Sequence, residues 1–135
     1  MTKPIPHYHV VAALVECEGD YLCVQRGKTK YEYTSYKYEF PGGKVEVGET
    51  EAEALKRELM EEMKYEVAVV RHLTTISHHY SDFCVTLSIH LCKAQTKAFE
   101  MREHVDFRWL KPKDMLSLPW VAADQQFIEE LPNFL

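Results

Sequence analysis

The sequence predicts an α+β fold in which a mixed β-sheet is sandwiched between α-helices, in an α/β/α arrangement. Three observations support this prediction. Apolar, β-branched stretches that are typical of strands lie on both sides of one helix pattern. That central helix has a narrow apolar stripe suited to packing on a sheet, and a second helix pattern closes the chain. Strands that flank a central helix favour layers of helix and sheet.

The chain has the length of one domain. Its 135 residues, 46% of them hydrophobic and 27% charged, suffice to bury one core, so we expect residues 1–135 to form a single domain. The formal net charge of −5 provides no general basic surface for a nucleic acid polymer or an anionic membrane, although it leaves room for a local basic patch.

The cysteines and the N-terminus predict the compartment. Cys17, Cys23, Cys84 and Cys92 form no C-x-x-C pair and lie in apolar stretches, as free cysteines do in reduced proteins. The segment MTKPIPHYHV lacks the apolar core of a signal peptide, and residues 10–15 are too few to span a bilayer. We therefore expect a cytoplasmic protein without a membrane partner.

The first expected element is a hairpin. Residues 7–16 and 21–26 are strand-like, and Glu18-Gly19-Asp20 between them supplies the residues of a tight turn. Residues 27–37 are polar and rich in tyrosine, and these rings are compatible with stacking on a base or with ordinary packing. Pro41-Gly42-Gly43 then predicts irregular backbone.

The best-defined element is a helix from Thr50 to about residue 63. Thr50 and Glu53 can satisfy each other's free backbone amides in a capping box. At the helical repeat, four apolar side chains fall in one stripe that we expect to pack on the sheet: Ala52, Leu55, Leu59 and Met63.

The second half of the chain predicts another hairpin, a short strand and a closing helix. Residues 65–80 and 83–93 are strand-like and are separated by a plausible turn at Ser81-Asp82. A short strand is expected at residues 104–110. Prolines then indicate a loop or brief helix before a closing helix near residues 122–131.

Three glutamates of the central helix form the clearest candidate site. Glu58, Glu61 and Glu62 are spaced i, i+3 and i+4, which places their carboxylates on one flank. Like charges at this spacing repel each other, and a hard dication would reverse that effect. Mg²⁺ or Mn²⁺ suits such a cluster, because a few carboxylates and substrate phosphates usually bind these ions. The spacing alone fits a solvated acidic face equally well.

A longer pattern surrounds these glutamates and favours a functional site. Gly43 is followed after five residues by Glu49, and after seven more by Arg57-Glu58-Leu59, one residue and Glu61-Glu62. This pattern resembles the signature of the Nudix hydrolases. The segment FPGGKVEVGE, residues 40–49, resembles the form in their MutT-like branch, which acts on nucleoside triphosphates. The order of elements is similar to the Nudix fold over nearly the whole length, which implies a single Nudix domain.

The chain departs from the family pattern at one position. The family has glycine two residues after the last glutamate, where this chain has Lys64. A glycine would let the helix end in a left-handed turn, for which a lysine costs about 1 kcal/mol. The sequence therefore leaves the exit of the helix open, whereas the carboxylates lie upstream of it.

The resemblance implies a metal site in the motif. In the family, the glutamates matched by Glu58, Glu61 and Glu62 bind metal with help from a backbone carbonyl in the glycine pair matched by Gly42 and Gly43. Glu61 and Glu62 are the expected ligands. Glu58 is either a third ligand or the base that takes a proton from the attacking water.

The resemblance also implies two supporting roles close to these carboxylates. Arg57 is expected to orient Glu58, although ordinary surface ion pairs are the alternative. Glu49 is expected to brace the loop against the helix through ion pairing.

Other positions match family contacts outside the motif. Glu103 precedes Trp109 at the spacing of a further metal-binding or basic glutamate in MutT-like proteins, with an ordinary loop charge as the alternative. Arg26 and Lys44 match phosphate contacts. Lys28, although close in sequence, is better explained as a solubilising surface charge.

The last candidate is Asp124, which matches a base-reading residue of MutT-like enzymes at the start of the closing helix. An ionised carboxylate only accepts hydrogen bonds and would favour an amino donor such as N4 of cytosine. A protonated carboxyl could also donate, which would admit an oxidised guanine. The alternative role is a helix N-cap.

Together these features imply a Mg²⁺-dependent (deoxy)nucleoside triphosphate pyrophosphohydrolase, with Mn²⁺ as an alternative ion, that releases monophosphate and pyrophosphate. CTP, 5-methyl-dCTP and 8-oxo-dGTP are the candidate substrates, and sanitation of the nucleotide pool is the candidate role. The alternatives are a Nudix enzyme for another nucleoside diphosphate-linked substrate and a non-catalytic nucleotide-binding module. We expect a monomer or homodimer that binds small nucleotides and no nucleic acid polymer.

Overall fold

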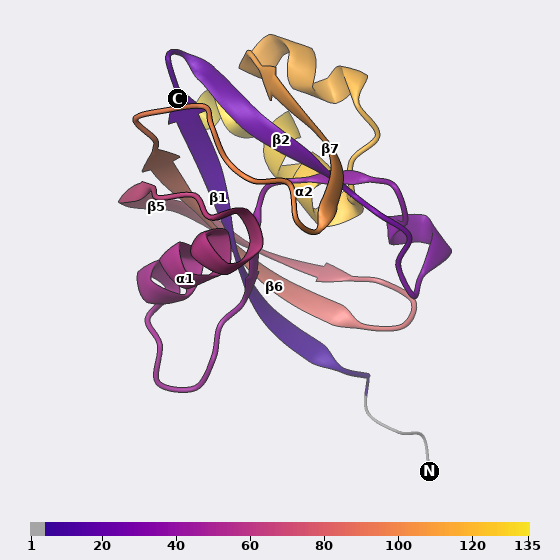
Figure 1. Cartoon of the computed structure of the whole chain (residues 1–135). Helices are drawn as coiled ribbons and strands as arrows, with labels where there is room; N and C mark the ends of the chain where they lie inside the picture. The colour runs from indigo at the N-terminus through magenta and orange to yellow at the C-terminus, as the bar shows by residue number, and fades with distance from the viewer. Residues whose placement is uncertain (1–4) are drawn as a thin grey trace.

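Strand β1 (His7–Cys17) organises the fold of residues 5–135, the part of the chain that this computed structural model describes. It pairs in parallel with β6 (Cys84–Lys93) and in antiparallel orientation with β2 (Asp20–Arg26) and β4 (Gly42–Lys44). The sheet is therefore mixed, which confirms the predicted fold class (Figure 1).

The remaining strands extend this sheet at both edges. β5 (Ala68–His79) pairs with β6 at one edge, whereas β3 (Tyr38–Glu39) and β7 (His104–Leu110) both pair with β2. The antiparallel pairing of β5 with β6 confirms the second predicted hairpin, although β5 begins only at Ala68, after a connection in which Tyr65 and Val67 are buried.

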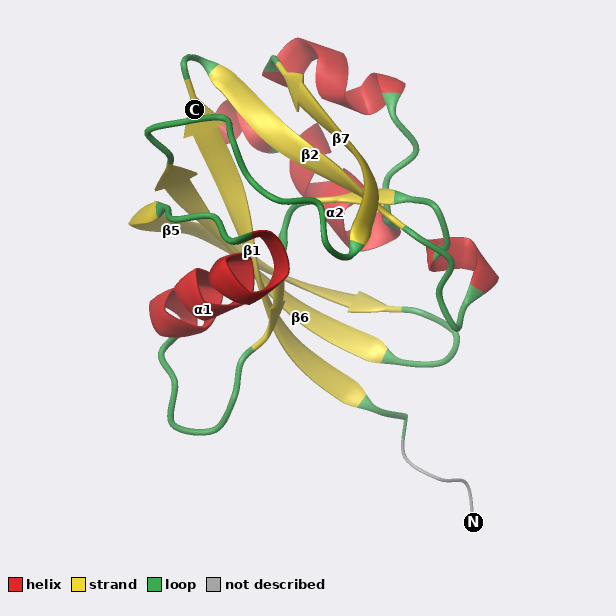
Figure 2. Cartoon of the chain, in the orientation of Figure 1, coloured by secondary structure: helices red, strands yellow, loops and turns green. Residues whose placement is uncertain are grey.

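The two main helices cover opposite faces of the sheet. Side chains of β1 alternate between these faces, so Val11 and Val15 pack with α1 (Glu51–Met63), whereas Leu14 packs with α2 (Ala122–Glu129). Figure 2 shows the strands between the helices. The predicted α/β/α arrangement is confirmed, and β1 contributes to both hydrophobic cores.

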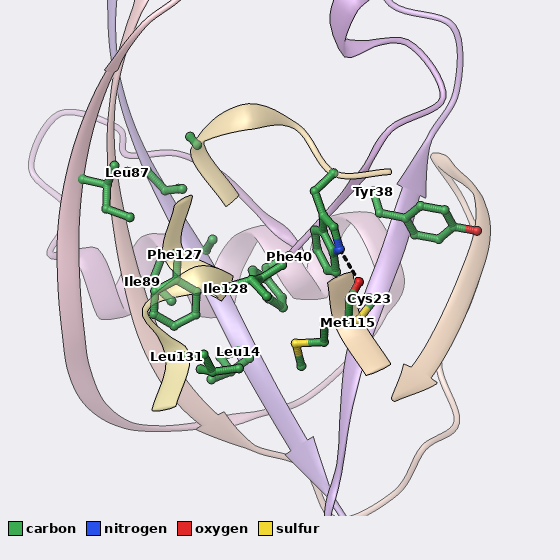
Figure 3. Close-up of a cluster of buried hydrophobic side chains, with 14 of the residues drawn as sticks. Leu14, Cys23, Tyr38, Phe40, Leu87, Ile89, Met115, Phe127, Ile128 and Leu131 are labelled. Atoms are coloured by element: carbon green, nitrogen blue, oxygen red, sulfur yellow. Dashed lines mark hydrogen bonds between the residues drawn. The ribbon is translucent and has the colours of Figure 1, made fainter. Parts of the chain in front are cut away.

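The core beneath α2 also fixes the strand that leads into the motif. Figure 3 shows Phe40 lying among the apolar side chains of this core, near Phe127 and Leu14. The Trp120 indole N–H donates a hydrogen bond to the carbonyl oxygen of Met115 at 2.6 Å, so its polar atom is satisfied inside the core. The packing anchors the chain directly before the glycine pair.

The strands β1 and β2 form a tight hairpin and then separate. Glu18 and Gly19 have φ angles of 54° and 84°, as the predicted turn requires, and the pairing starts at Cys17 with Asp20. Further from the turn, β4 lies beside β1 between Val10 and Ala12, and β2 pairs with β3 and β7. The hairpin therefore opens toward the start of β1.

The prediction of irregular backbone at the glycine pair is wrong. Gly42 and Gly43 begin β4 and pair with Ala12 and Val11 of β1. A Cβ atom on Gly42 would lie 1.9 Å from the Val11 carbonyl oxygen, so β4 could not approach β1 with a side chain there. The glycine serves close approach of two strands here, whereas the sequence pattern suggested a turn.

Helix α1 has the predicted start and core-facing stripe. The capping box between Thr50 and Glu53 is present, and both backbone amides are satisfied by the partner's side chain. Leu55, Leu59 and Met63 are buried, as predicted. Ala52 is only half-buried, whereas Ala54 is fully buried. The buried stripe of the helix therefore includes Ala54 in place of Ala52.

The exit of α1 is left-handed even though it lacks the family's glycine. Lys64 has φ 47° and ψ 46°, and its N–H donates to the Met60 carbonyl at 3.0 Å. The next N–H, of Tyr65, donates to the Leu59 carbonyl at 3.2 Å. The lysine thus takes the conformation that costs about 1 kcal/mol for a residue with a side chain.

The C-terminal part follows the sequence prediction with one shortened helix. Pro112–Ser117 forms a short 3-10 helix, and α2 ends at Glu129 before a final turn at Leu131–Asn133. Pro132 has no N–H to donate to the Ile128 carbonyl, so the α-helical hydrogen bonds of α2 cannot continue through residue 132. A further short 3-10 helix, Glu32–Thr34, lies in the tyrosine-rich segment. Within residues 5–135, no helix is both long and apolar enough to cross a membrane.

Candidate active site

Arg57 lies at the centre of the contacts that organise the α1 carboxylates. Its guanidinium donates to both carboxylate oxygens of Glu49, at 2.6 and 2.9 Å, and to Glu58 at 2.9 Å. It also donates to Glu61 at 3.2 Å and to the Lys44 carbonyl at 3.1 Å. The expected ion pair of Glu49 is confirmed, and Arg57 contacts the carboxylate of Glu58 that it was expected to orient.

Glu58 is packed against the glycine pair. A Cβ atom on Gly43 would lie 2.4 Å from the carboxyl carbon of Glu58, so only glycine leaves room for this carboxylate beside β4. The side chain of Glu58 is 15% exposed. One oxygen contacts Arg57, and the glycine backbone lies close to the carboxyl group. The geometry brings Glu58 and Gly43 together, as the resemblance implied.

Glu62 has no cationic partner within the described residues to offset its negative charge. Among residues 5–135 it forms no ion pair with Lys, Arg or His. Burial raises the pKa of Glu62 well above its usual range, and the nearby charges of Glu58, Glu103 and Glu39 raise it further. Four carboxylates are thus close enough to affect one another.

The donor set fits a magnesium or manganese ion. Within the described residues, no three His, Cys, Asp or Glu side chains gather tightly enough to hold an ion by themselves. Mg²⁺ seldom requires such a cage, because one or two carboxylates and the substrate phosphates usually bind it. The repulsion that raises the pKa of Glu62 is also the type of strain that a dication relieves.

A cleft of about 550 Å³ brings most of the candidate residues together. Its volume is in the range of small-molecule sites. The predicted site residues that line it are Arg26, Gly42, Gly43, Lys44, Glu62, Glu103 and Asp124. Three others lie outside its lining: Glu58, which packs against Gly43, Arg57, which contacts the Lys44 carbonyl, and Glu61, which is exposed and contacts Arg57.

Positive side chains lie in the same cleft as the carboxylates. Arg26, at the end of β2, lies 3.6 Å from Glu39, and the Lys44 ammonium lies 4.2 Å from the centre of the Tyr8 ring. Lys28 also lines the cleft, although its side chain is exposed, as its interpretation as a surface charge requires. The sequence could not show that residue 28 borders this cleft.

Asp124 lines the cleft and is not a helix N-cap. The N-cap of α2 is Val121, without a side-chain cap bond, so the alternative role proposed from the sequence is wrong. Asp124 is 5% exposed and accepts a hydrogen bond from the Phe40 N–H at 2.8 Å. Burial raises the pKa of Asp124 to about 8, and the charge of Glu39 contributes to this shift.

Aromatic rings form another wall of the cleft. Of the four tyrosines at positions 31, 33, 36 and 38, only Tyr31 lines it, together with Tyr80 and Phe83 of the β5–β6 turn. The Tyr31 ring centre lies 5.1 Å from that of Phe83, and Tyr80 stacks on Phe83 at 4.7 Å. The phenol oxygen of Tyr80 accepts a hydrogen bond from the Ala123 N–H at 3.1 Å.

Sequence reasoning missed one charged residue of the cleft. Glu39 lies in the two-residue strand β3, directly before Phe40, and lines the cleft. A charged residue inside the apolar run Tyr38-Glu39-Phe40 was the available signal, since strand alternation places it on a different face from its buried neighbours.

Comparisons with known proteins identify the family of this chain. The family model described as "NUDIX domain" matches residues 6–131. A CTP pyrophosphohydrolase from Escherichia coli K12 is 31% identical over 120 residues, which cover 89% of this chain and 87% of the relative. An 8-oxo-dGTP diphosphatase from Proteus vulgaris is 46% identical over 54 residues, 40% of this chain and 48% of the relative.

The fold is shared with solved structures. The crystal structure of a MutT protein from Methanosarcina mazei Go1 matches 98% of this chain and 97% of its own, with a TM-score of 0.86 and 21% identity. At this identity the match supports the fold alone.

Proposed function

The chain belongs to the NUDIX family and is a hydrolase of phosphoric anhydride bonds, and from this premise we propose that it is a Mg²⁺-dependent nucleoside triphosphate pyrophosphohydrolase. It would add water to an inner phosphorus of the substrate and release a nucleoside monophosphate and pyrophosphate. Mn²⁺ is the alternative ion. The candidate bases are cytosine, 5-methylcytosine and 8-oxoguanine, and the candidate role is sanitation of the nucleotide pool.

One observation carries the proposal: one nucleotide-sized cleft is lined by two chemically different sets of groups. Gly43, Glu62 and Glu103 contribute oxygen ligands and negative charge to its lining. The buried Asp124 lines the same cleft, where it can meet a base. A triphosphate with its ion fits the first set, and a nucleobase fits Asp124.

The proposed metal site consists of Glu58, Glu61 and Glu62 with a carbonyl of Gly42 or Gly43 and with Glu103, which directly precedes β7. A bound ion would neutralise phosphate charge and lower the pKa of the attacking water. Arg57 would hold Glu58 in place, and Glu58 or Glu103 would take the proton from water as general base.

The phosphates would also meet positive side chains of the cleft. Arg26 of β2 and Lys44 of β4 both line it, and both can donate hydrogen bonds to phosphate oxygens. Lys28 is a third cation in the lining. These contacts would offset the repulsion between the substrate and an acidic protein.

Asp124 supports recognition of a base edge that offers both a donor and an acceptor. With its pKa raised to about 8, its carboxyl group is mostly protonated at neutral pH, so it can donate through O–H and accept through the other oxygen. Cytosine has an amino donor beside a ring-nitrogen acceptor, and 8-oxoguanine also presents adjacent donors and acceptors.

The deciding experiment measures pyrophosphate release from CTP, dCTP, 5-methyl-dCTP, dGTP and 8-oxo-dGTP, with and without Mg²⁺. We compare the wild type with Glu62→Gln and with Glu66→Gln, a matched control at an exposed position outside the cleft. We expect Mg²⁺-dependent turnover of at least one triphosphate, lost in Glu62→Gln and kept in the control. If the folded wild type hydrolyses none of them, a diphosphate-linked substrate or a non-catalytic binding role replaces our proposal.

We further propose that residues 1–135 act as one domain, as a monomer or homodimer, on small cytoplasmic nucleotides. The family model covers most of this length, and all four cysteines are free thiols. Burial raises the pKa of both Cys23 and Cys92 to about 12, which makes these thiols unreactive.

A further inference from the structure

Glu39 is a charged cleft residue to which the proposed reaction gives no role so far. Strand β3 presents its side chain to the cleft, where it is 25% exposed. Its two carboxylate oxygens have different partners. One lies 3.6 Å from the Arg26 guanidinium, and the other lies 3.4 Å from Nε2 of His104. The carboxylate is therefore held between β2 and β7 with limited freedom to turn.

Glu39 lies close both to Asp124 and to the proposed metal ligands. Phe40, the next residue, donates its N–H to Asp124, which places Glu39 close to the proposed base contact. Its negative charge acts on Asp124 and also on Glu62, a proposed metal ligand. His104 directly follows Glu103, so the partner of Glu39 is next to another proposed metal ligand.

The part of a nucleotide that lies between its base and its phosphates is the sugar. An ionised carboxylate accepts hydrogen bonds and repels phosphate, so a phosphate is a poor neighbour for Glu39. Sugar hydroxyls are donors, and bonds from them to a carboxylate are charge-assisted. We infer that Glu39, positioned by Arg26 and His104, binds the sugar hydroxyls of the substrate and determines its specificity for the sugar. This inference rests on the proposed function.

A competing explanation is that Glu39 only positions Arg26 for the phosphates. The two explanations differ in one measurable quantity. If Glu39 binds the sugar, the effect of replacing it depends on which hydroxyls the substrate carries. If it only positions Arg26, its replacement slows all sugar variants by the same factor.

The experiment compares kcat/KM for CTP and GTP with the values for their 2′-deoxy, 3′-deoxy and 2′,3′-dideoxy analogues. The proteins are the wild type, Glu39→Gln, Glu39→Ala and the exposed control Glu66→Gln. Glu39→Gln keeps the shape of the side chain and one acceptor, whereas Glu39→Ala removes the acceptor. Thermal unfolding of each variant shows that it is folded.

For the wild type, we expect kcat/KM to be about tenfold or more lower for the dideoxy analogue than for the parent nucleotide, as the loss of a hydrogen bond to a charged group predicts. Glu39→Ala should lower kcat/KM about tenfold for the parent nucleotide and less than about threefold for the dideoxy analogue. For the parent nucleotide, kcat/KM of Glu39→Gln should lie between the values of the wild type and of Glu39→Ala. The single-deoxy analogues then identify the hydroxyl.

If each Glu39 variant lowers kcat/KM by the same factor for the parent and the dideoxy nucleotides, the inference is overturned and the proposed function remains intact. The absence of turnover for every triphosphate by the wild type would instead remove the proposed function, and the inference with it. The control Glu66→Gln is expected to keep the ratios of the wild type.

Discussion

At the scale of single residues, Glu62 combines two opposing demands. Its position beside Glu58 and Glu103 suits an ion with its substrate, yet without an ion the same position disfavours the charged form. Folding the metal-free protein at neutral pH therefore requires the carboxyl to take up a proton or to remain charged at a cost. A residue selected for stability alone would be neutral here.

Glu62→Gln should accordingly separate stability from activity. In the presence of a chelator at pH 7, we expect the free energy of unfolding of this variant to exceed that of the wild type. The difference should be on the order of 1 kcal/mol, since the carboxyl group is only partly buried. Its Mg²⁺-dependent turnover should fall by about 100-fold or more. Urea unfolding and pyrophosphate release measure the two effects. A variant that is less stable and fully active would contradict the assignment of Glu62 to the metal site.

Asp124 makes a prediction about pH. Its pKa is raised from 3.8 to about 8 in the folded protein, so between these values the folded state holds a proton that the unfolded chain has released. Its contribution to stability is therefore fully present below about pH 4 and decreases as the pH rises toward 8. Asp124→Asn keeps an acceptor for the Phe40 N–H and removes this titration.

We expect Asp124→Asn to gain stability relative to the wild type as the pH increases from 4 to 8, the interval between the two pKa values. The measurement is the free energy of unfolding in urea at several pH values, with the exposed Asp114→Asn as control. A constant difference between Asp124→Asn and the wild type over this interval would show that the carboxyl does not titrate there.

At the scale of elements, helix α1 sets the orientation of the catalytic motif through its two ends. The capping box fixes its start, and the left-handed Lys64 fixes its exit without the glycine of the family pattern. Between these ends, Leu55, Leu59 and Met63 attach one face to the sheet. The opposite flank then presents the carboxylates to β4 and the cleft.

Lys64→Gly should stabilise the protein by about 0.5 to 1 kcal/mol, because glycine adopts the left-handed conformation without strain but loses more entropy on folding. Lys56→Gly, at an exposed position inside α1, is the matched control and should destabilise by about 1 kcal/mol. Urea unfolding compares the two. If both variants lose stability equally, the φ of 47° at Lys64 carries no strain.

At the scale of the whole molecule, the site arises from the way strands β1 and β2 diverge. Near the turn they pair with each other, and further away β4 pairs with β1 while β3 pairs with β2. The cleft draws its lining from both sides of this division, with Val10 and Gly42 on one side and Arg26 and Glu39 on the other. Substrate binding would therefore link two parts of the sheet.

This architecture predicts that the ion and the nucleotide stabilise the fold cooperatively. Mg²⁺ together with a non-hydrolysable CTP or 8-oxo-dGTP analogue should raise the Tm by more than the sum of their separate effects, because the phosphates complete the coordination of the ion. Differential scanning calorimetry measures this coupling, and it should be lost in Glu62→Gln. Purely additive shifts in the wild type would argue against a shared site.

Much of the fold was predictable because local patterns determined it. The capping box, the apolar stripe of α1 and the turn at Glu18-Gly19 each depend on residues a few positions apart, and each was confirmed. The motif likewise identified Arg57 and Glu58, whose contact at 2.9 Å follows from their position on one helix and the packing against Gly43.

The sequence by itself determined the family, the layered α/β/α fold and the residue types of the candidate site. Tertiary structure alone decided that Gly42 begins a strand, that Asp124 is buried rather than capping a helix, and that Lys28 and Glu39 face the cleft. The physical reason is that burial, pKa and the close approach of strands depend on residues distant in the chain. The carboxyl group of Asp124 accepts a hydrogen bond from the Phe40 N–H, and the Val11 carbonyl leaves no room for a side chain at Gly42.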